Sequence, residues 1–442
     1  MQQIISYQEV ARLAFPLIIS QAVILLSGMI DLAFIGPYGT AAIAAVSIAN
    51  ALCATLFNFC EGFRLGTTVL IAKASAAGDK SKVTAVINSG LLLAALIGLV
   101  LLVGAPVISN AVYGFAGDRL VAAHGVDYLK VWLWTIPVIL WNYVLVGLFR
   151  GLRDTRTPLY STLVICLLNI FFAYAFVYGG LGFPRLGVKG AAWATMLANF
   201  IGLLLLIGMA TAKPLTKQYL SVKHLCWRQL TEYISLAVDV GLNTGFTLLA
   251  LLIFVGMIKP LGAAALAVHQ ITLQVFNFAY LPAVGFLITA SILVPRLLEQ
   301  KQEYLVMPTV SRIGKLSFGV IFVISGLLYI SAPAVSNLFS PADKTVAQQT
   351  AQVLKLICFA QLFSSLYMVL RGALTGCNDT RFIVWEGLGS GYLVFLPLAY
   401  LFAIYLGYGV YGGYVAFLLW CITDCCLLVW RFYYHRGWGQ RN

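Results

Sequence analysis

Long hydrophobic runs follow one another along the whole chain, separated by short polar segments. Each run approaches or exceeds the roughly 20 apolar residues that a helix needs to cross a bilayer. Membrane-spanning strands would show a period of two over much shorter segments, so the runs predict helices. There are twelve, at residues 8–35, 45–71, 83–108, 121–148, 158–179, 188–210, 231–258, 264–294, 311–336, 349–374, 382–406 and 410–432.

The chain also contains an internal repeat. The segment GTAAIAAVSIANALCATLFNFCEGF from Gly39 matches GAAALAVHQITLQVFNFAYLPAVGF from Gly262. At nearly the same shift, GLFRGLRDTR at 147–156 matches GALTGCNDTR at 372–381, and GVKGAA at 187–192 matches GVYGGY at 409–414. We therefore predict an all-α polytopic membrane protein with two six-helix lobes around a central cavity, a typical transporter architecture. The predicted parts are an N-lobe at 1–210, a cytoplasmic linker at 211–230 and a C-lobe at 231–442.

Composition excludes a soluble protein, and the placement of charge argues against a nucleic-acid binder. Of the 442 residues, 61% are hydrophobic and only 10% are charged, whereas soluble proteins carry about 25% charged residues. The net charge is +13. If both termini are cytoplasmic, twenty of the 28 Lys and Arg residues fall in cytoplasmic segments and six in outer ones. By the positive-inside rule this predicts a multi-pass protein of a bacterial-type inner membrane with both termini cytoplasmic.

After Arg12, Asp31 is the only charged residue of the first span. At the shift of the repeat it matches Phe254, so the fold itself does not require the acid. A carboxylate in mid-membrane costs about 2.5–3.5 kcal/mol and usually marks a proton or ion path. The alternative is that Asp31 lies near the outer membrane surface and is simply solvated, because Gly36 and Pro37 soon end the helix.

The other chemistry-bearing residues form no recognisable enzymatic or metal site. The four histidines make no HExxH pair, the nine cysteines have no metal-ligand spacing, and no Walker sequence is present. We therefore expect no enzymatic activity and no cofactor. Glu61 and Arg64, three residues apart on one helical face, are either a pair that lines a cavity or a structural ion pair. Glu386 and Asp424 are expected close to helix ends and receive no role.

At these segments the chain resembles the multidrug and toxic compound extrusion (MATE) transporters over essentially its whole length. The resemblance rests on MIDLAFIG, AKASAAGDKSKV, FRGLRDTRTPLYS, LLNIFFAYAFVYGGLG and GVKGAAWATMLANF, together with the six-plus-six repeat. FRLGTTVLIAK, which contains Arg64, and AVDVGLN, which contains Asp239, look most like the DinF-like branch.

The resemblance implies a cation-coupled exporter whose helix-1 acid, here Asp31, takes a proton or a sodium ion. It also implies a bend of the first helix at Pro16 and polar partners for the acid at Asn169 and Thr195, with Asn199 a looser match. Further polar candidates for the cavity are Gln21, Glu61, Arg64 and Asp239.

Two departures from the family pattern bear on the coupling ion. Where several members carry a second acid one turn after the helix-5 asparagine, this chain has Ala173. Where they carry a tyrosine one turn before the helix-1 acid, it has Ser27. Sodium prefers several oxygen ligands, whereas protonation needs one acid, so the departures favour protons over sodium. A weak Na⁺ site at Asp31, Asn169 and Thr195 stays an alternative.

We therefore expect a monomeric multidrug efflux antiporter that works by alternating access, with small, lipophilic, cationic compounds as substrates and membrane lipid around it. The alternative is a flippase for lipid-linked oligosaccharides or peptidoglycan precursors, which would need an arginine-rich cavity for pyrophosphate. A receptor or scaffold would explain neither the repeat nor an acid in one lobe only.

Overall fold

The computed structural model describes residues 5–114, 119–180, 182–221, 226–341 and 343–435, and all regular elements in these ranges are helical. Twelve helical segments among them are long and apolar enough to cross a membrane, which confirms the all-α class and the predicted number of spans. The α-helices are α1 (Tyr7–Ile35), α2 (Thr40–Ala76), α3 (Lys80–Gly114), α4 (Arg119–Gly151), α5 (Arg156–Tyr178), α6 (Val188–Ala212), α7 (Pro214–Lys217), α8 (Trp227–Ile258), α9 (Ala263–Glu299), α10 (Val306–Phe339), α11 (Lys344–Gly376), α12 (Thr380–Gly389), α13 (Leu396–Tyr400) and α14 (Gly409–Val429).

Most helices extend by a few residues beyond the apolar runs that predict them. The run at 349–374 becomes α11, which begins at Lys344 because Asp343 caps it. The Asp343 carboxylate accepts hydrogen bonds from the backbone nitrogens of Thr345 at 2.9 Å and Val346 at 3.1 Å. Such polar caps add a turn that hydropathy does not detect.

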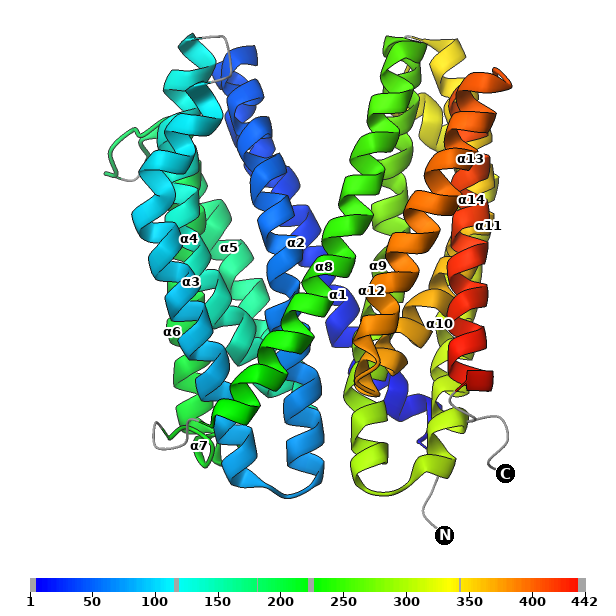
Figure 1. Cartoon of the computed structure of the whole chain (residues 1–442). Helices are drawn as coiled ribbons and strands as arrows, with labels where there is room; N and C mark the ends of the chain where they lie inside the picture. The colour runs from blue at the N-terminus through cyan, green and yellow to red at the C-terminus, as the bar shows by residue number, and fades with distance from the viewer. Residues whose placement is uncertain (1–4, 115–118, 181, 222–225, 342, 436–442) are drawn as a thin grey trace. The chain divides into compact units, whose positions relative to one another are not determined.

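The chain divides into two compact units. We call residues Ile19–Gly241 the N-terminal unit, and Met1–Ile18 together with Leu242–Asn442 the C-terminal unit. The division falls inside α1 and α8, so it cuts the chain differently from the predicted lobes and linker, and that domain division stays a prediction. Within each unit the long helices run side by side (Figure 1).

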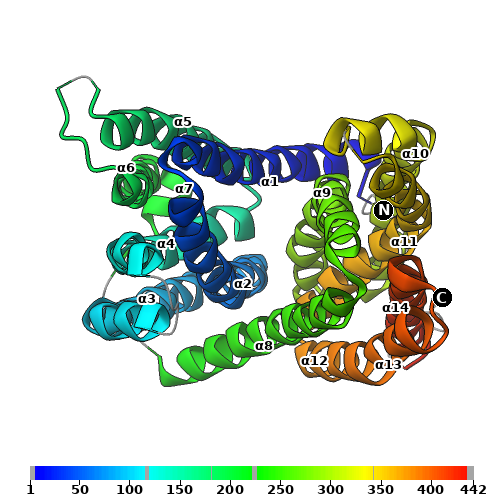
Figure 2. The same ribbon diagram turned by 90° about the horizontal axis from the view of Figure 1, so that it is seen from above.

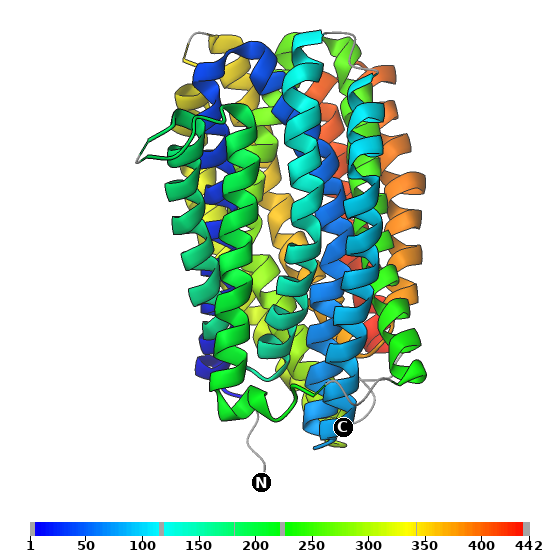
Figure 3. The same cartoon turned by 90° about the vertical axis from the view of Figure 1, so that its left-hand side faces the viewer.

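The same pattern of helix pairs occurs in both units, as the sequence repeat predicts. In the N-terminal unit α4 packs on α2, α3 and α6, and α5 lies beside α6 (Figures 2 and 3). In the C-terminal unit α11 packs correspondingly on α9, α10 and α14. The central cavity between the lobes stays a prediction.

The glycines of the repeated G-x-x-x-G motif explain why α4 and α11 approach their neighbours closely. A Cβ atom at Gly147 would lie 2.5 Å from Thr67 Cβ on α2, and one at Gly372 would lie 2.2 Å from the Leu287 carbonyl oxygen on α9. Only glycine permits such an approach of two helices.

Proline residues do not interrupt the spans. Pro16, Pro106, Pro137 and Pro282 lie inside continuous helices. Pro397, in the span at Thr380–Tyr405, is flanked by wider π-helical turns at Ser390–Phe395 and Leu401–Tyr405. Such turns compensate for the hydrogen bond that proline cannot donate. A hinge at Pro16 stays a prediction.

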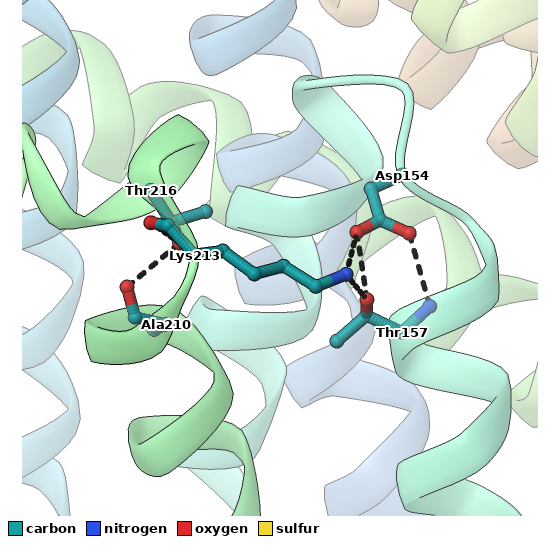
Figure 4. A network of polar contacts seen from close by, with 5 residues as sticks. All are labelled: Asp154, Thr157, Ala210, Lys213 and Thr216. Atoms are coloured by element: carbon teal, nitrogen blue, oxygen red, sulfur yellow. Dashed lines mark hydrogen bonds and ion pairs between the residues drawn. The ribbon is translucent and has the colours of Figure 1, made fainter.

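The segment that follows α6 is fixed to the N-terminal unit by a polar network (Figure 4). Lys213 Nζ contacts Asp154 Oδ2 at 2.6 Å and also donates to Thr157 Oγ1. Asp154 Oδ1 accepts from the Thr157 backbone nitrogen at 3.0 Å, which caps the start of α5. Thr216 Oγ1 donates to the Ala210 carbonyl oxygen at 2.7 Å and closes the turn into α7.

This network predicts a pH-dependent contribution to stability. Burial raises the pKa of Asp154, but hydrogen bonds from Lys213 and Thr157 prevail and hold that pKa below its ordinary value. The stabilisation is therefore complete above about pH 4, the ordinary aspartate pKa, and is lost as the pH falls through the lower folded-state pKa. At pH 7 we expect Asp154→Asn to lower the stability by about 1 kcal/mol.

The measurement is the melting temperature in one detergent between pH 7 and pH 3, for wild type, Asp154→Asn and Lys213→Met. The difference between wild type and each variant should shrink below about pH 4. A difference that stays constant over this range contradicts the assignment.

Candidate functional site

Asp31 lies on α1, one turn before the helix ends at Ile35. Its side chain is half-buried. The Oδ1 atom is shielded from solvent and has no hydrogen-bond partner among the described residues. At least this oxygen of the carboxylate is therefore shielded from water by the protein. The alternative, in which Asp31 is simply solvated near the outer membrane surface, does not account for this shielding.

Asn169 on α5 is the direct partner of Asp31. The Asn169 side chain lies close enough to the Asp31 carboxylate to interact with it. Asn169 Nδ2 donates to Thr195 Oγ1 on α6 at 3.1 Å, and Asn169 Oδ1 accepts from Ser27 Oγ on α1 at 3.5 Å. The amide nitrogen thus faces Thr195, while the amide oxygen faces Ser27. Asn169 itself is only 3% exposed, so the group lies inside the unit.

The hydrogen bonds continue from Thr195 to the neighbouring helices. Thr195 Oγ1 donates to the Ala191 carbonyl oxygen at 3.1 Å, and Asn199 Nδ2 donates to the Thr195 carbonyl oxygen at 2.8 Å. Asn142 Nδ2 on α4 donates to the Asn199 carbonyl oxygen at 3.1 Å. Asn199 therefore supports the backbone of α6 behind Thr195 with its side-chain amide, and the structure does not direct that amide at Asp31.

The structure adds two residues that the sequence analysis missed. Tyr128 on α4 is buried and lies close enough to Asp31 for a charge interaction. Its hydroxyl donates to Asn50 Oδ1 on α2 at 3.3 Å. Five helices of the N-terminal unit thus contribute to the surroundings of one acid. A polar Asn50 in an apolar run was a weak signal, whereas nothing in the sequence pointed to Tyr128.

Glu61 and Arg64 form a separate charged group on α2. Arg64 Nε donates to Glu61 Oε2 at 2.8 Å, and Arg64 Nη2 pairs with Glu61 Oε1. The Arg64 guanidinium lies 5.0 Å from the centre of the Tyr143 ring on α4. Arg150, at the end of α4, interacts with both charges and is only 3% exposed. The structure thus contains an ion pair between Glu61 and Arg64. Both interpretations of this pair, as part of a cavity wall or as a structural ion pair, stay predictions.

Three further candidates lie on α1 and α8. Gln21 and Asp239 are half-buried, on α1 and α8. Asp239 lies two residues after Ala237, at which α8 closely approaches α2. A Cβ at Gly62 of α2 would lie 2.0 Å from the Ala237 carbonyl oxygen. Pro16 falls in the C-terminal unit. Roles for these three residues stay predictions.

The polar groups around Asp31 are few. Within the described residues no group of three His, Cys, Asp or Glu side chains could hold a metal. Asp31 supplies one carboxylate, and the side chains of Asn169 and Thr195 lie next to it in the polar group. A hard cation such as Na⁺ requires several converging oxygens.

A family model decides the identity of the chain. The model described as MatE matches residues 16–175 and again 241–401, so the two matches are separated along the chain as the repeated motifs are. The chain belongs to the MatE family. The match confirms the family resemblance inferred from the sequence motifs of this MATE protein. Its membership of the DinF-like branch stays a prediction.

Curated relatives of this MATE protein extend over nearly its full length. A probable multidrug resistance protein NorM from Thermotoga maritima is 26% identical over 414 residues, covering 93% of this chain and 89% of the relative. The multidrug resistance protein MdtK from Edwardsiella ictaluri is 26% identical, covering 98% and 96%.

Solved structures share its fold. An outward-facing multidrug resistance MATE family transporter of the MOP superfamily superimposes with a TM-score of 0.90 at 18% identity, covering 98% of this chain and 97% of the other. A MOP superfamily transporter from Pyrococcus furiosus superimposes with a TM-score of 0.85 at 18% identity, covering 98% and 96%. At this identity the likeness supports the fold alone.

Proposed function

We propose that this MATE protein is a secondary active multidrug efflux antiporter in which Asp31 carries the coupling ion. The observation that carries the proposal is the Asp31 carboxylate, whose Oδ1 atom is buried and unpaired among the described residues. A charged oxygen that is buried without a partner is costly. Either a proton or a cationic substrate removes that cost, and the two cannot occupy one carboxylate together. This competition is the basis of antiport.

We further propose that the coupling ion is H⁺ rather than Na⁺ and that the chain belongs to the DinF-like branch. The Asn169 oxygen is engaged by Ser27 and its nitrogen by Thr195, so we take Asp31 as the one charged oxygen donor of the site. A proton needs only the acid itself. In the proposed cycle, proton entry from outside bends α1 near Pro16 and releases the substrate outward, and deprotonation towards the cytoplasm restores the substrate site.

The ion choice predicts a gain of sodium dependence in Ala173→Asp. Ala173 lies one turn after Asn169 on α5 and is fully buried. A second carboxylate there raises the charge and the number of oxygen donors that a hard cation requires. Wild-type efflux should follow the pH gradient with little sodium dependence, and Ala173→Asp should respond to sodium.

The measurement is substrate efflux at fixed pH across a sodium titration. Ala175→Asp is the control, because it places the same carboxylate at another buried position of α5, on a different helical face. It should gain no sodium dependence. Strong sodium activation of the wild type overturns the assignment of protons.

The substrates we propose are small lipophilic cations, and the protein works as a monomer. The names of the curated relatives, multidrug resistance proteins, support a broad substrate range. An acid beside the buried ring of Tyr128 suits a cation by charge and by cation–π contact. The distribution of Lys and Arg supports an inner-membrane location with cytoplasmic termini.

A flippase is the second candidate, favoured by the two buried arginines of the N-terminal unit. Arg64 and Arg150 are 6% and 3% exposed, and pyrophosphate is recognised by such groups. Glu61 already neutralises Arg64, which leaves one buried positive charge where pyrophosphate needs more. Translocation of a lipid-linked oligosaccharide by reconstituted protein, without export of any dye, would favour this candidate.

A further inference from the structure

A second buried acidic group lies in the C-terminal unit, where the sequence analysis expected residues close to helix ends. Glu386 lies on α12 and Asp424 on α14, and they are only 5% and 8% exposed. Each acid does lie within the last turns of its α-helix, since α12 ends at Gly389 and α14 at Val429, but the helical spans continue beyond these ends. The span of Glu386 begins at Thr380 and continues to Tyr405, and that of Asp424 extends from Gly409 to Tyr434, so both acids lie inside apolar spans.

The two carboxylates face each other across the helices. The side chains of Glu386 and Asp424 are in hydrogen-bonding contact. Three of their four carboxylate oxygens receive no hydrogen bond from another donor in the described ranges, namely both oxygens of Glu386 and Oδ1 of Asp424. A hydrogen bond between two carboxyl groups requires a hydrogen on one of them. These side chains thus supply acceptors for a proton and lack the donor.

Asp424 has polar neighbours on α14 and at the end of α12 besides Glu386. Ser390, one turn after Glu386, accepts from Trp420 Nε1 at 3.0 Å, and both side chains lie close enough to Asp424 to interact with it. Ser390 also begins the π-helical turn at Ser390–Phe395. Such turns often occur at functional sites, because the extra residue redirects side chains.

Helix α8 packs against the turn that carries Glu386. Asn243 is fully buried, and its Nδ2 donates to the Ile383 carbonyl oxygen at 2.8 Å. A Cβ atom at Gly387 would lie 2.4 Å from Asn243 Nδ2. The Asn243 Oδ1 atom is buried and finds no partner in the part of the chain that the structure describes. The helix that packs on this turn thus carries a buried, unpartnered acceptor of its own.

The charges around the pair leave room for one proton. Arg371 on α11 interacts with both acids, and its Nη2 donates to Thr244 Oγ1 of α8 at 3.4 Å. Two carboxylates and one guanidinium sum to one negative charge, which a single shared proton neutralises. The other titratable groups that face the pair are of types whose ordinary pKa values lie above neutral pH, namely Tyr280 on α9, Tyr367 on α11 and Cys421 and Cys425 on α14.

We propose that Glu386 and Asp424 form a second proton-binding site, in which the two carboxyl groups share one proton. Like charges that face each other in a buried site favour this sharing over two ionised acids. The positive Arg371 disfavours a further metal cation at the same place. Proton binding at this pair does not depend on Asp31, and its use in transport rests on the proposed function.

The experiment is infrared difference spectroscopy of the purified full chain, recorded between high and low pH without any substrate. It is run in Asp31→Asn, which removes the contribution of the first acid. We expect the carbonyl stretch of a protonated carboxylic acid, shifted in D₂O and unaffected by sodium. Glu386→Gln and Asp424→Asn, each added to Asp31→Asn, should lose this band. Asp127→Asn, which alters an exposed aspartate of α4, should retain it.

The proposal is overturned if the band is absent from Asp31→Asn, if it persists in both added variants, or if sodium abolishes it at fixed pH. If the added variants do not fold, isotope labelling keeps the test in the wild-type side chains. Carbon-13 in the glutamate or aspartate carboxyl groups of Asp31→Asn must then shift the band, and a band that neither label shifts contradicts the site. The experiment measures protonation and not transport. Its result therefore tests the second site even if the proposed efflux function is wrong.

Discussion

Asp31→Asn is expected to abolish coupled export and to leave the protein folded and inserted. Asparagine keeps the shape of the side chain and its place beside Asn169, but it cannot take up or release a proton. The Oδ1 atom of Asp31 is buried without a partner in the described ranges, so loss of the charge removes a cost of folding. The melting temperature should therefore stay equal or rise, while export falls to the level of cells without the protein.

The measurement is dye efflux from cells that contain equal amounts of wild-type and variant protein in the membrane. Asp127→Asn serves as the matched control, because Asp127 is an exposed aspartate of the same unit that pairs with Lys189 at 3.4 Å. It should export at the wild-type rate. Wild-type export by Asp31→Asn excludes Asp31 as the coupling site.

Glu61→Gln is expected to cause a large loss of stability. Glu61 is the acid that pairs with Arg64 and acts on Arg150, and both arginines are buried. Removal of the acid leaves two uncompensated positive charges in the interior. The Glu61 side chain is 32% exposed, so water screens part of the effect, and we expect a cost of about 2 kcal/mol, between that of a surface pair and that of a buried pair. We expect a marked drop of the melting temperature in a single detergent.

A second variant separates the charge effect from the loss of contacts. Glu61→Gln combined with Arg64→Gln leaves only Arg150 charged, so part of the stability should return. Glu232→Gln is the control, because its pair with Lys73 spans 3.9 Å at partly exposed side chains and contributes less than about 1 kcal/mol. If the double variant is no more stable than Glu61→Gln, the group lines a cavity through specific contacts and is no structural ion pair.

The fold was predictable because its signals are local or repeated. Apolar runs long enough for a bilayer define the spans, and the repeated glycines at Gly147 and Gly372 mark the close contacts of α4 and α11. Asp31 was predictable because a charge in an apolar span is costly and therefore informative. Its partners Asn169 and Thr195 followed only from the family resemblance. Residues that meet from different helices have no characteristic spacing in a single sequence.

The misses have a common physical cause. Tyr128 is an ordinary helical tyrosine until α4 turns it towards Asp31. Glu386 and Asp424 lie far apart in the sequence on separate helices, and each alone resembles a residue at a helix end. Only the packing of α12 on α14 brings the two carboxylates together and removes them from water.

The most direct test of the central claim is uptake of a lipophilic cation, such as ethidium, into proteoliposomes under one imposed gradient at a time. An acidic interior without sodium should drive uptake by the wild type, because protons leave as the cation enters. A sodium-loaded interior at equal pH should drive none, and Asp31→Asn should take up nothing under either gradient. Uptake by Asp31→Asn at the wild-type rate, or uptake driven by sodium alone, contradicts proton coupling at Asp31.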